Sequence, residues 1–245
     1  MNYSIILPTL NENGHIIQLI RNIKKNFKTK KNKYEIIIVD DNSTDGTIDT
    51  VKNFIKKNSE TKLYVRHNQK KNLAKSINLG IHKSRYENII WMDADFQHPP
   101  EYIKKMIPKM QNYDVIIFSR FLEKSKRYFK KNIKVKEFNE NQSILFNKIC
   151  NFIFYKDITD YTSGYICIKK KILKNFELKG FYGEYFLSLI IYCKKNNYKI
   201  LELPFVEKIR KTGSSKTIGD NKIRYMITCY NYFFSVFKNC ISKVL

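Results

Sequence analysis

The sequence predicts an α/β fold built on a single doubly wound, mostly parallel sheet. Over the first 120 residues, short apolar runs alternate with stretches in which apolar residues recur at helical spacing. This alternation is typical of strands joined by right-handed helical crossovers. Polar residues, several of them carboxylates, follow the apolar runs directly. In such sheets ligands bind beyond the carboxyl ends of the strands, so we expect the ligand site at that edge.

Five apolar runs in the first half predict strands at residues 3–7, 34–39, 61–65, 88–92 and 114–118. Helical spacing between them predicts helices at about 13–27, 45–57 and 72–84. Asn11 or Asn13 is the expected cap of the first helix, and the Pro99-Pro100 pair is expected to open a further one.

The second half of the chain is less regular. Residues 120–142 form a polar, strongly basic segment without clean periodicity, which predicts a long mobile loop. Helices are predicted at about 143–154 and 183–196, and strands at 165–169 and 199–203. The last 25 residues keep helical spacing and predict an amphipathic helix, either packed on the domain or associated with a membrane. We therefore expect one domain over 1–217 and a terminal helix over 218–245.

The chain is strongly basic, with 46 Lys plus Arg residues against 22 Asp plus Glu and a formal net charge of +24. This excess favours an anionic partner, such as nucleic acid, an anionic membrane surface or a phosphorylated substrate. Five widely spaced cysteines without a Cys-x-x-Cys pair indicate free thiols in a reducing compartment. The chain start lacks the features of a signal peptide, and no stretch reaches the roughly 20 apolar residues that cross a bilayer. A cytosolic location is expected.

The string Asp93-Ala-Asp-Phe-Gln-His-Pro-Pro follows the central apolar run. In an extended segment, side chains at i and i+2 point to the same side. Asp93 and Asp95 can then converge on one hard cation, with Gln97 adding a neutral oxygen. A Mg²⁺ or Mn²⁺ ion held this way keeps open positions for phosphate oxygens, which suits a nucleotide diphosphate. The alternative is a loop whose aspartates cap the helix beginning near Pro99.

Six segments of the chain carry a resemblance to a known family. They lie at residues 6–12, 38–46, 92–101, 119–120, 160–165 and 210–216. On these segments the chain resembles the family 2 glycosyltransferases with the glycosyltransferase A fold, a Rossmann-like nucleotide-binding fold. Within that family it is similar to the dolichyl- or polyprenyl-phosphate mannose or glucose synthases. The string Asp-Ala-Asp-x-Gln-His-Pro-Pro-Glu at 93–101 is its most specific part.

The resemblance implies a role for each matching segment. The nucleotide pocket would be lined by Pro8, Leu10, Glu12, Val39 and Asp41. The metal and the diphosphate would be surrounded by Asp93, Ala94, Asp95 and Gln97. The phosphates of donor or acceptor would be held by Arg120, Arg210 and Lys216. The chain departs from the family after Arg120, where the segment is rich in lysine and has no glycine, with Lys134, Lys136 or Arg127 as candidates for the family's arginine, and at Leu10, where many relatives have an aromatic residue.

The resemblance further implies metal-dependent transfer of a hexosyl group, with inversion, from a nucleotide sugar to polyprenyl or dolichyl phosphate. GDP-mannose is the favoured donor. A phosphate acceptor is already ionised near neutral pH and needs no strong base, which fits a sequence without an obvious catalytic histidine. His98 is expected at a helix entry, and His15, His67 and His82 at the surface. The enzyme would act at the cytosolic face of a membrane, in peripheral contact with the bilayer or with a membrane-protein partner.

Three other functions compete with this interpretation. One is a family 2 enzyme using a UDP-sugar and a saccharide hydroxyl acceptor in cell-surface polysaccharide synthesis, which needs an added base, with Asp157 or Asp160 the first candidates. The second is nucleic-acid binding, but no known module is present and a carboxylate-rich edge repels phosphate without metal, so no nucleic-acid partner is expected. The third is a catalytically silent partner, against which the intact Asp93 and Asp95 argue.

Overall fold

The computed structural model describes residues 1–27, 32–122, 134–208 and 222–244, the side chains of 134–140, 222–225 and 242–244 excepted. The strands of this part are β1 (Tyr3–Thr9), β2 (Tyr34–Asp40), β3 (Thr61–Val65), β4 (Asn88–Trp91), β5 (Val115–Ser119), β6 (Ile166–Lys169) and β7 (Ile200–Pro204). The α-helices are α1 (Ile16–Lys25), α2 (Thr47–Ile55), α3 (Leu73–Lys83), α4 (Ile103–Met106), α5 (Lys134–Ile153), α6 (Tyr185–Lys195) and α7 (Lys222–Val244). Short 3₁₀ helices lie at Pro100–Tyr102, Ile107–Gln111 and Lys170–Lys174.

The strands form one sheet in the order β3-β2-β1-β4-β6-β5-β7. Only β6 among them runs antiparallel, pairing with β4 on one side and β5 on the other. The order reverses next to β1, where β2 and β4 flank it, as in doubly wound sheets. The mostly parallel α/β fold predicted from the sequence is therefore confirmed.

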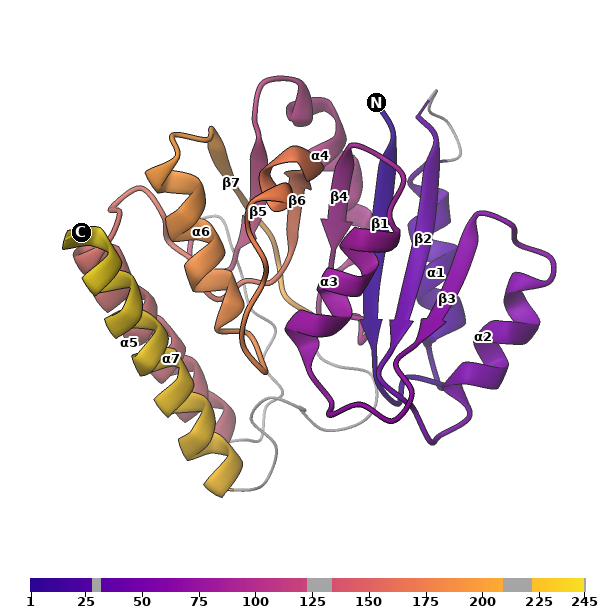
Figure 1. Cartoon of the computed structure of the whole chain (residues 1–245), viewed down its shortest axis with the longest axis horizontal. Helices are drawn as coiled ribbons and strands as arrows, with labels where there is room; N and C mark the ends of the chain where they lie inside the picture. The colour runs from indigo at the N-terminus through magenta and orange to yellow at the C-terminus, as the bar shows by residue number, and fades with distance from the viewer. Residues whose placement is uncertain (28–31, 123–133, 209–221, 245) are drawn as a thin grey trace.

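Helices cover both faces of the sheet, as Figure 1 shows. The helices α3 and α6 pack on one face, against strand residues such as Ile6 and Ile37. On the other face α1 and α4 pack against the alternate strand residues, among them Ile5 and Leu7. Strands buried on both faces read as continuous apolar runs, which is why their positions were recognisable in the sequence.

One glycine sets how closely α3 approaches the sheet. A Cβ atom added at Gly80 would stand 2.4 Å from Cγ2 of Ile6 in β1. The backbone of α3 therefore rests directly on the central strand. This close packing fixes the start of α3, and with it Asn72 and Arg66, at the carboxyl end of β2 and β3.

The structure differs from the sequence prediction at two helices. The helix α1 begins at Ile16, and its cap position, His15, makes no side-chain cap hydrogen bond. Asn11 and Asn13 do not cap α1, because both bind the loop after β2. Residues 134–142 are the first part of α5 and not a loop. Their sequence carries little helical periodicity because only Val135 and Phe138 among them are apolar. The remainder of the predicted loop, 123–133, lies outside the described residues.

The five cysteines are free thiols, as predicted. Within the described ranges, no helix combines the length and apolar character that crossing a membrane requires.

Candidate active site

The loops that follow β1 and β2 are tied together at the carboxyl edge of the sheet. The backbone N–H of Asn11 donates to Oγ of Ser43 at 2.8 Å, and the side chain of Asn11 accepts from the N–H of Thr44 at 2.9 Å. Ser43 in turn donates to the buried carboxylate of Asp40, through its N–H and its hydroxyl, each at 2.7 Å. Backbone segments distant in sequence thus form one rigid rim over β1 and β2.

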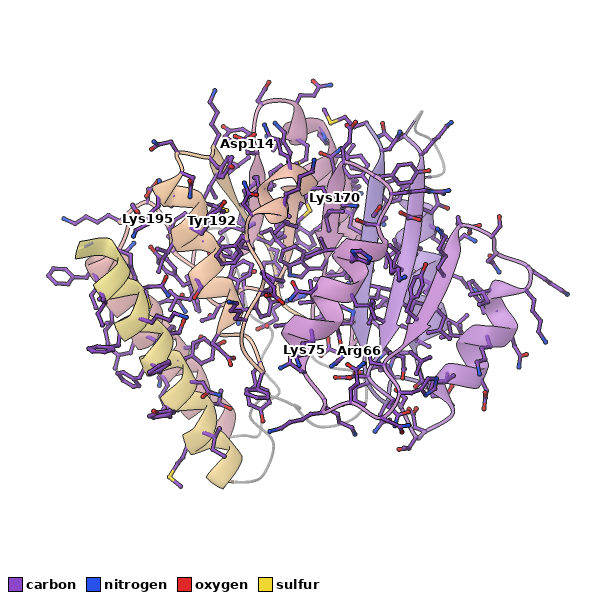
Figure 2. All side chains as sticks on the ribbon, in the orientation of Figure 1. Arg66, Lys75, Asp114, Lys170, Tyr192 and Lys195 are labelled. Atoms are coloured by element: carbon purple, nitrogen blue, oxygen red, sulfur yellow. The ribbon has the colours of Figure 1, made fainter. Side chains whose placement is uncertain are left out.

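Asp41, assigned to the nucleotide pocket, is buried beside a cation that the sequence analysis missed. Nη1 of Arg66 lies 2.5 Å from Oδ1 of Asp41, and the N–H of Asn72 donates to Oδ2 at 2.6 Å. Burial raises the pKa of Asp41, although both contacts and Lys71 oppose the rise. Figure 2 shows Arg66 at the carboxyl edge of the strands, opposite Asp114 at the other edge. Arg66 could have been found from the sequence by its position directly after the apolar run at 61–65.

The acidic string after β4 forms a turn and is not extended. Phe96 takes a positive φ of 68°, and the N–H of Gln97 donates to Oδ1 of Asp95 at 2.9 Å. The side chain of Asp95 is buried, with the residue 1% exposed, whereas the side chain of Asp93 is 48% exposed. The extended i and i+2 geometry predicted for Asp93, Asp95 and Gln97 is therefore wrong, because the chain must reverse here to enter the Pro99-Pro100 segment.

The buried side chain of His98 is hydrogen-bonded to the backbone of this acidic turn. Its Nδ1 accepts a hydrogen bond from the backbone N–H of Asp93 at 3.0 Å, and its ring stacks on Tyr165 with 4.9 Å between the ring centroids. Burial lowers the pKa of His98, although Asp95 and Glu207 oppose the shift. A neutral imidazole matches its role as a hydrogen-bond acceptor. From the sequence, His98 was expected only at a helix entry. In the structure its ring also fixes the position of Asp93, through the hydrogen bond to the Asp93 backbone.

His15 is also not the surface residue that was predicted. It is buried, and its Nε2 lies 2.8 Å from Oε2 of Glu12, which is buried too. The carboxylate of Glu12, which was assigned to the nucleotide pocket, is therefore oriented by His15 from the turn before α1. His67 and His82 are exposed, as expected.

Arg120 forms a buried ion pair with Asp160. The guanidinium donates from Nε to Oδ2 of Asp160 and from Nη2 to Oδ1, both at 2.8 Å, and the backbone N–H of Arg120 donates to Oδ2 as well. Nη2 also donates to Oγ1 of Thr162 at 2.6 Å. Burial by itself raises the pKa of Asp160, but the charge and hydrogen bonds of Arg120 outweigh it and hold that pKa below its ordinary value. Arg120 is thus a fixed positive charge at the edge of the sheet.

Glu202 of β7 supports the same turn. Its Oε2 accepts from the N–H and hydroxyl of Thr159, at 2.9 and 2.8 Å, and its Oε1 accepts from the N–H of Asp160 at 3.1 Å. Burial raises the pKa of Glu202 to about 7, and the charge of Asp160 adds to the rise, whereas the hydrogen bonds oppose it. The turn carrying Asp160 is therefore linked to a carboxyl that titrates near neutral pH.

This raised pKa predicts a stability that depends on pH. Because folded Glu202 holds its proton to higher pH than the unfolded chain, the free energy of unfolding falls as pH rises from about 4.5 to about 7. We expect the wild-type protein to lose roughly 2 kcal/mol more than Glu202→Gln over this range. Denaturant unfolding of both proteins at several pH values measures the difference. The substitution itself gives a pH-independent offset, so parallel curves for the two proteins would contradict the prediction.

The remaining predicted site residues fall into two groups. Pro8 and Leu10 are half-buried at the end of β1, whereas the side chains of Val39 and Ala94 are buried in the two cores. Only the backbone of Val39 is therefore available to the predicted nucleotide pocket. Arg210 and Lys216 lie outside the described residues.

The donors of the acidic turn fit a hard divalent cation. Within the described part of the chain, no cluster of three or more His, Cys, Asp or Glu side chains is arranged to hold a metal. The turn offers instead the two carboxylates of Asp93 and Asp95, one half-exposed and one buried. Mg²⁺ is commonly bound by one or two carboxylates, with substrate phosphates and water as its other ligands. The turn matches that pattern.

Comparisons with known proteins agree with this architecture. In sequence, the chain is 28% identical to the dolichol-phosphate mannosyltransferase of Pyrococcus furiosus over 94% of this chain and 63% of that protein. It thus spans less than two thirds of that relative's length. The enzyme of the same name from Saccharomyces cerevisiae is 24% identical over 92% of this chain and 85% of that protein.

Solved structures share the fold at low sequence identity. Glucosyl-3-phosphoglycerate synthase from Mycobacterium tuberculosis in complex with phosphoglyceric acid superposes with a TM-score of 0.69, at 12% identity, over 98% of this chain and 80% of that one. TarS from S. aureus gives a TM-score of 0.58 at 20% identity, over 85% of this chain and 37% of that one.

A family model covers most of the region that builds the site. Residues 4–176 match the model for glycosyl transferase family 2, a span that includes the rim of β1 and β2, Arg66, the acidic turn and the Arg120–Asp160 pair. The resemblance inferred from the sequence motifs is confirmed, and the chain belongs to glycosyl transferase family 2.

Proposed function

We propose that this protein transfers a hexosyl group, with inversion, from a nucleotide sugar to polyprenyl or dolichyl phosphate, with GDP-mannose as the favoured donor. The observation that carries the proposal is the acidic turn of Asp93 and Asp95, placed at the same sheet edge as the buried Asp41–Arg66 pair. The relatives from Pyrococcus furiosus and Saccharomyces cerevisiae, both named dolichol-phosphate mannosyltransferase, support the choice of acceptor.

The rim over β1 and β2 and the acidic turn after β4 form the proposed site for the nucleotide-sugar donor. Asp41, Glu12 and the backbone around Pro8 form the part of the edge suited to a nucleoside, and the acidic turn lies beside it on β4. Mg²⁺ or Mn²⁺ bound there supplies positive charge that stabilises a departing nucleotide diphosphate. Solved fold neighbours bound to Mn²⁺ or Mg²⁺ together with UDP support a divalent cofactor. Asp93 and Asp95 would hold the ion and Gln97 would add a neutral oxygen, while His98 keeps the backbone of Asp93 in place.

The proposal of a phosphate acceptor is supported by the contacts of the candidate general bases. A hydroxyl acceptor needs a general base within reach, but a phosphate oxygen is already ionised. Asp160 is bound to Arg120, and Asp157 pairs with Lys194 at 2.6 Å. Nδ1 of His98 accepts from Asp93, and both oxygens of Glu202 accept from the 159–160 turn. These engagements favour a lipid phosphate, and Arg120, Arg210 and Lys216 are the proposed cations for its charge and that of the donor.

The proposed acceptor places the enzyme at the cytosolic face of a membrane, in peripheral contact with the bilayer. Residues 1–217 are proposed as the catalytic domain and 218–245 as a C-terminal amphipathic helix that is packed on the domain or associated with the membrane. No nucleic-acid partner enters this proposal, because the carboxylates of the rim would repel a polyphosphate that brings no metal.

The test is a panel of donors and acceptors. GDP-mannose, UDP-glucose and UDP-N-acetylglucosamine are each incubated with polyprenyl phosphate, with Mn²⁺, with Mg²⁺ and with a chelator. We expect turnover with GDP-mannose that disappears on chelation and returns with added metal, measured as radiolabelled sugar in the lipid phase. Failure of every donor with lipid phosphate, together with turnover on a saccharide hydroxyl, would overturn the proposal.

A further inference from the structure

Large exposed apolar side chains gather on the outer side of α7. Their spacing places them on one face of the helix, and each is about half exposed or more. They are Met226, Ile227, Tyr230, Phe233, Phe234, Phe237 and Ile241. A helix of a water-soluble domain normally turns such a face toward the core, so this arrangement calls for a physical explanation.

The opposite side of α7 explains why the apolar face points outward. Oγ of Ser235 lies 3.2 Å from Oγ of Ser188 in α6, and the side-chain amide of Asn239 donates to the same Ser188 hydroxyl at 3.0 Å. Thr228 is buried on this side. These polar contacts with α6 fix the rotation of α7 about its axis. The phenylalanines of α7 are therefore exposed because the opposite side of the helix packs on α6.

The helix α5 extends the exposed apolar surface. Leu145, Ile149 and Phe152 follow one another at helical spacing on its outer side, and Phe152 is 81% exposed. The two helices touch where Phe146 of α5 meets Tyr232 of α7, with 5.2 Å between ring centroids. In Figure 1 they form the outermost layer of the molecule, and both begin at the end where the parallel strands finish. We call these ten exposed side chains the α5–α7 surface.

Charge indicates what covers this surface. The helix α7 contains Lys222, Arg224, Lys238 and Lys243 and no acidic residue, and the whole chain carries +24. Two copies of so basic a chain repel each other, which disfavours self-association through this face. Apolar and aromatic side chains combined with basic residues are typical of helices that lie in the interface of an anionic bilayer.

We propose that the α5–α7 surface docks on an anionic lipid bilayer, with both helices lying in the plane of the membrane. The inference deepens the proposed function and rests on it in one respect, namely that the acceptor is a membrane lipid. Docking at this surface sets the membrane beside α5 and α7, which begin at the same end of the molecule as the carboxyl ends of the parallel strands. The apolar side chains supply burial energy, and the net positive charge of the chain supplies attraction to anionic head groups.

The test is co-sedimentation of the full chain with vesicles that contain neither sugar donor nor polyprenyl phosphate, so its outcome is independent of transfer activity. Vesicles of phosphatidylcholine alone are compared with vesicles of equal parts phosphatidylcholine and phosphatidylglycerol. We expect binding to the anionic vesicles that weakens with salt. The double variant Phe233→Ser and Phe237→Ser is expected to bind at least about tenfold more weakly, because two exposed rings no longer enter the bilayer.

Two variants show where the contact lies. Phe152→Ser on α5 is expected to weaken binding several-fold, whereas Phe181→Ser, an exposed phenylalanine that belongs to neither helix, is expected to bind as the wild type does. Circular dichroism melts confirm that each variant is folded, which is expected because the rings are already exposed. Three results would each overturn the proposal. They are no binding to either kind of vesicle, equal binding by the wild type and the α7 double variant, and light scattering that shows a dimer for the wild type but a monomer for the double variant.

Discussion

Replacement of Asp95 by Asn is expected to lower the rate of sugar transfer by at least about a hundredfold, which is the size of effect seen when charge stabilisation of a transition state is lost. Asp95 is buried at the acidic turn, and its Oδ1 accepts from the N–H of Gln97. Asparagine keeps the shape of the side chain and this acceptor but removes the negative charge. The turn should therefore persist while its affinity for a divalent cation falls.

Three measurements separate this chemical effect from a structural one. The transfer rate with GDP-mannose and polyprenyl phosphate reports function, calorimetric titration with Mn²⁺ reports metal affinity, and thermal melting reports the fold. Asp49→Asn, a carboxylate exposed on α2, is the matched control and should leave all three unchanged. Near-normal transfer by Asp95→Asn would mean that the acidic turn is only structural. A large drop in melting temperature would assign the loss to misfolding.

Replacement of Asp160 by Ala is expected to lower the free energy of unfolding by about 3–5 kcal/mol, because it removes the bidentate partner of the largely buried Arg120 and leaves it only Glu207, 3.8 Å away, as a counter-charge. The two side chains share two hydrogen bonds of 2.8 Å, and Asp160 is fully buried. Removing one partner costs far more than the pair contributes in total. Denaturant titration followed by circular dichroism measures the change.

The same ion pair offers two controls. Asp157→Ala removes the exposed partner of Lys194, a few residues away, and should cost less than about 1 kcal/mol. The double variant Asp160→Ala with Arg120→Met removes both charges of the pair, and it should be more stable than Asp160→Ala alone because the guanidinium is no longer left without its bidentate partner. A double variant that is less stable than Asp160→Ala would show that Arg120 stabilises the fold through other contacts.

The sequence was informative wherever structure is set locally. Runs such as 34–39 and 88–92 are buried on both faces, so their apolar character alone marked them as strands. The site residues Asp41, Asp93 and Arg120 were located by their place directly after such runs. Local patterns were less informative at 134–142, where only Val135 and Phe138 are apolar and the sequence carries little periodic signal.

The partners of these residues were not predictable, because they come from distant parts of the chain. Arg66 meets Asp41 across 25 positions and Arg120 meets Asp160 across 40, and neither pairing leaves a mark in local periodicity. The burial of His98 against Tyr165 depends on β6 entering the sheet antiparallel between β4 and β5. Such contacts follow from strand order and register, which are decided by the packing of the whole chain.

By itself, the sequence determined the order of the main elements and placed the candidate site residues after the apolar runs, at the carboxyl edge of the sheet. Side-chain spacing and strand-end position are local properties, so one chain is enough to read them. The tertiary structure decided the shape of the acidic turn, the pairing of the buried charges and the side of α7 that faces solvent. Each of these depends on neighbours that only folding brings within a few ångströms, as Ser188 does when it holds the polar side of α7 inward.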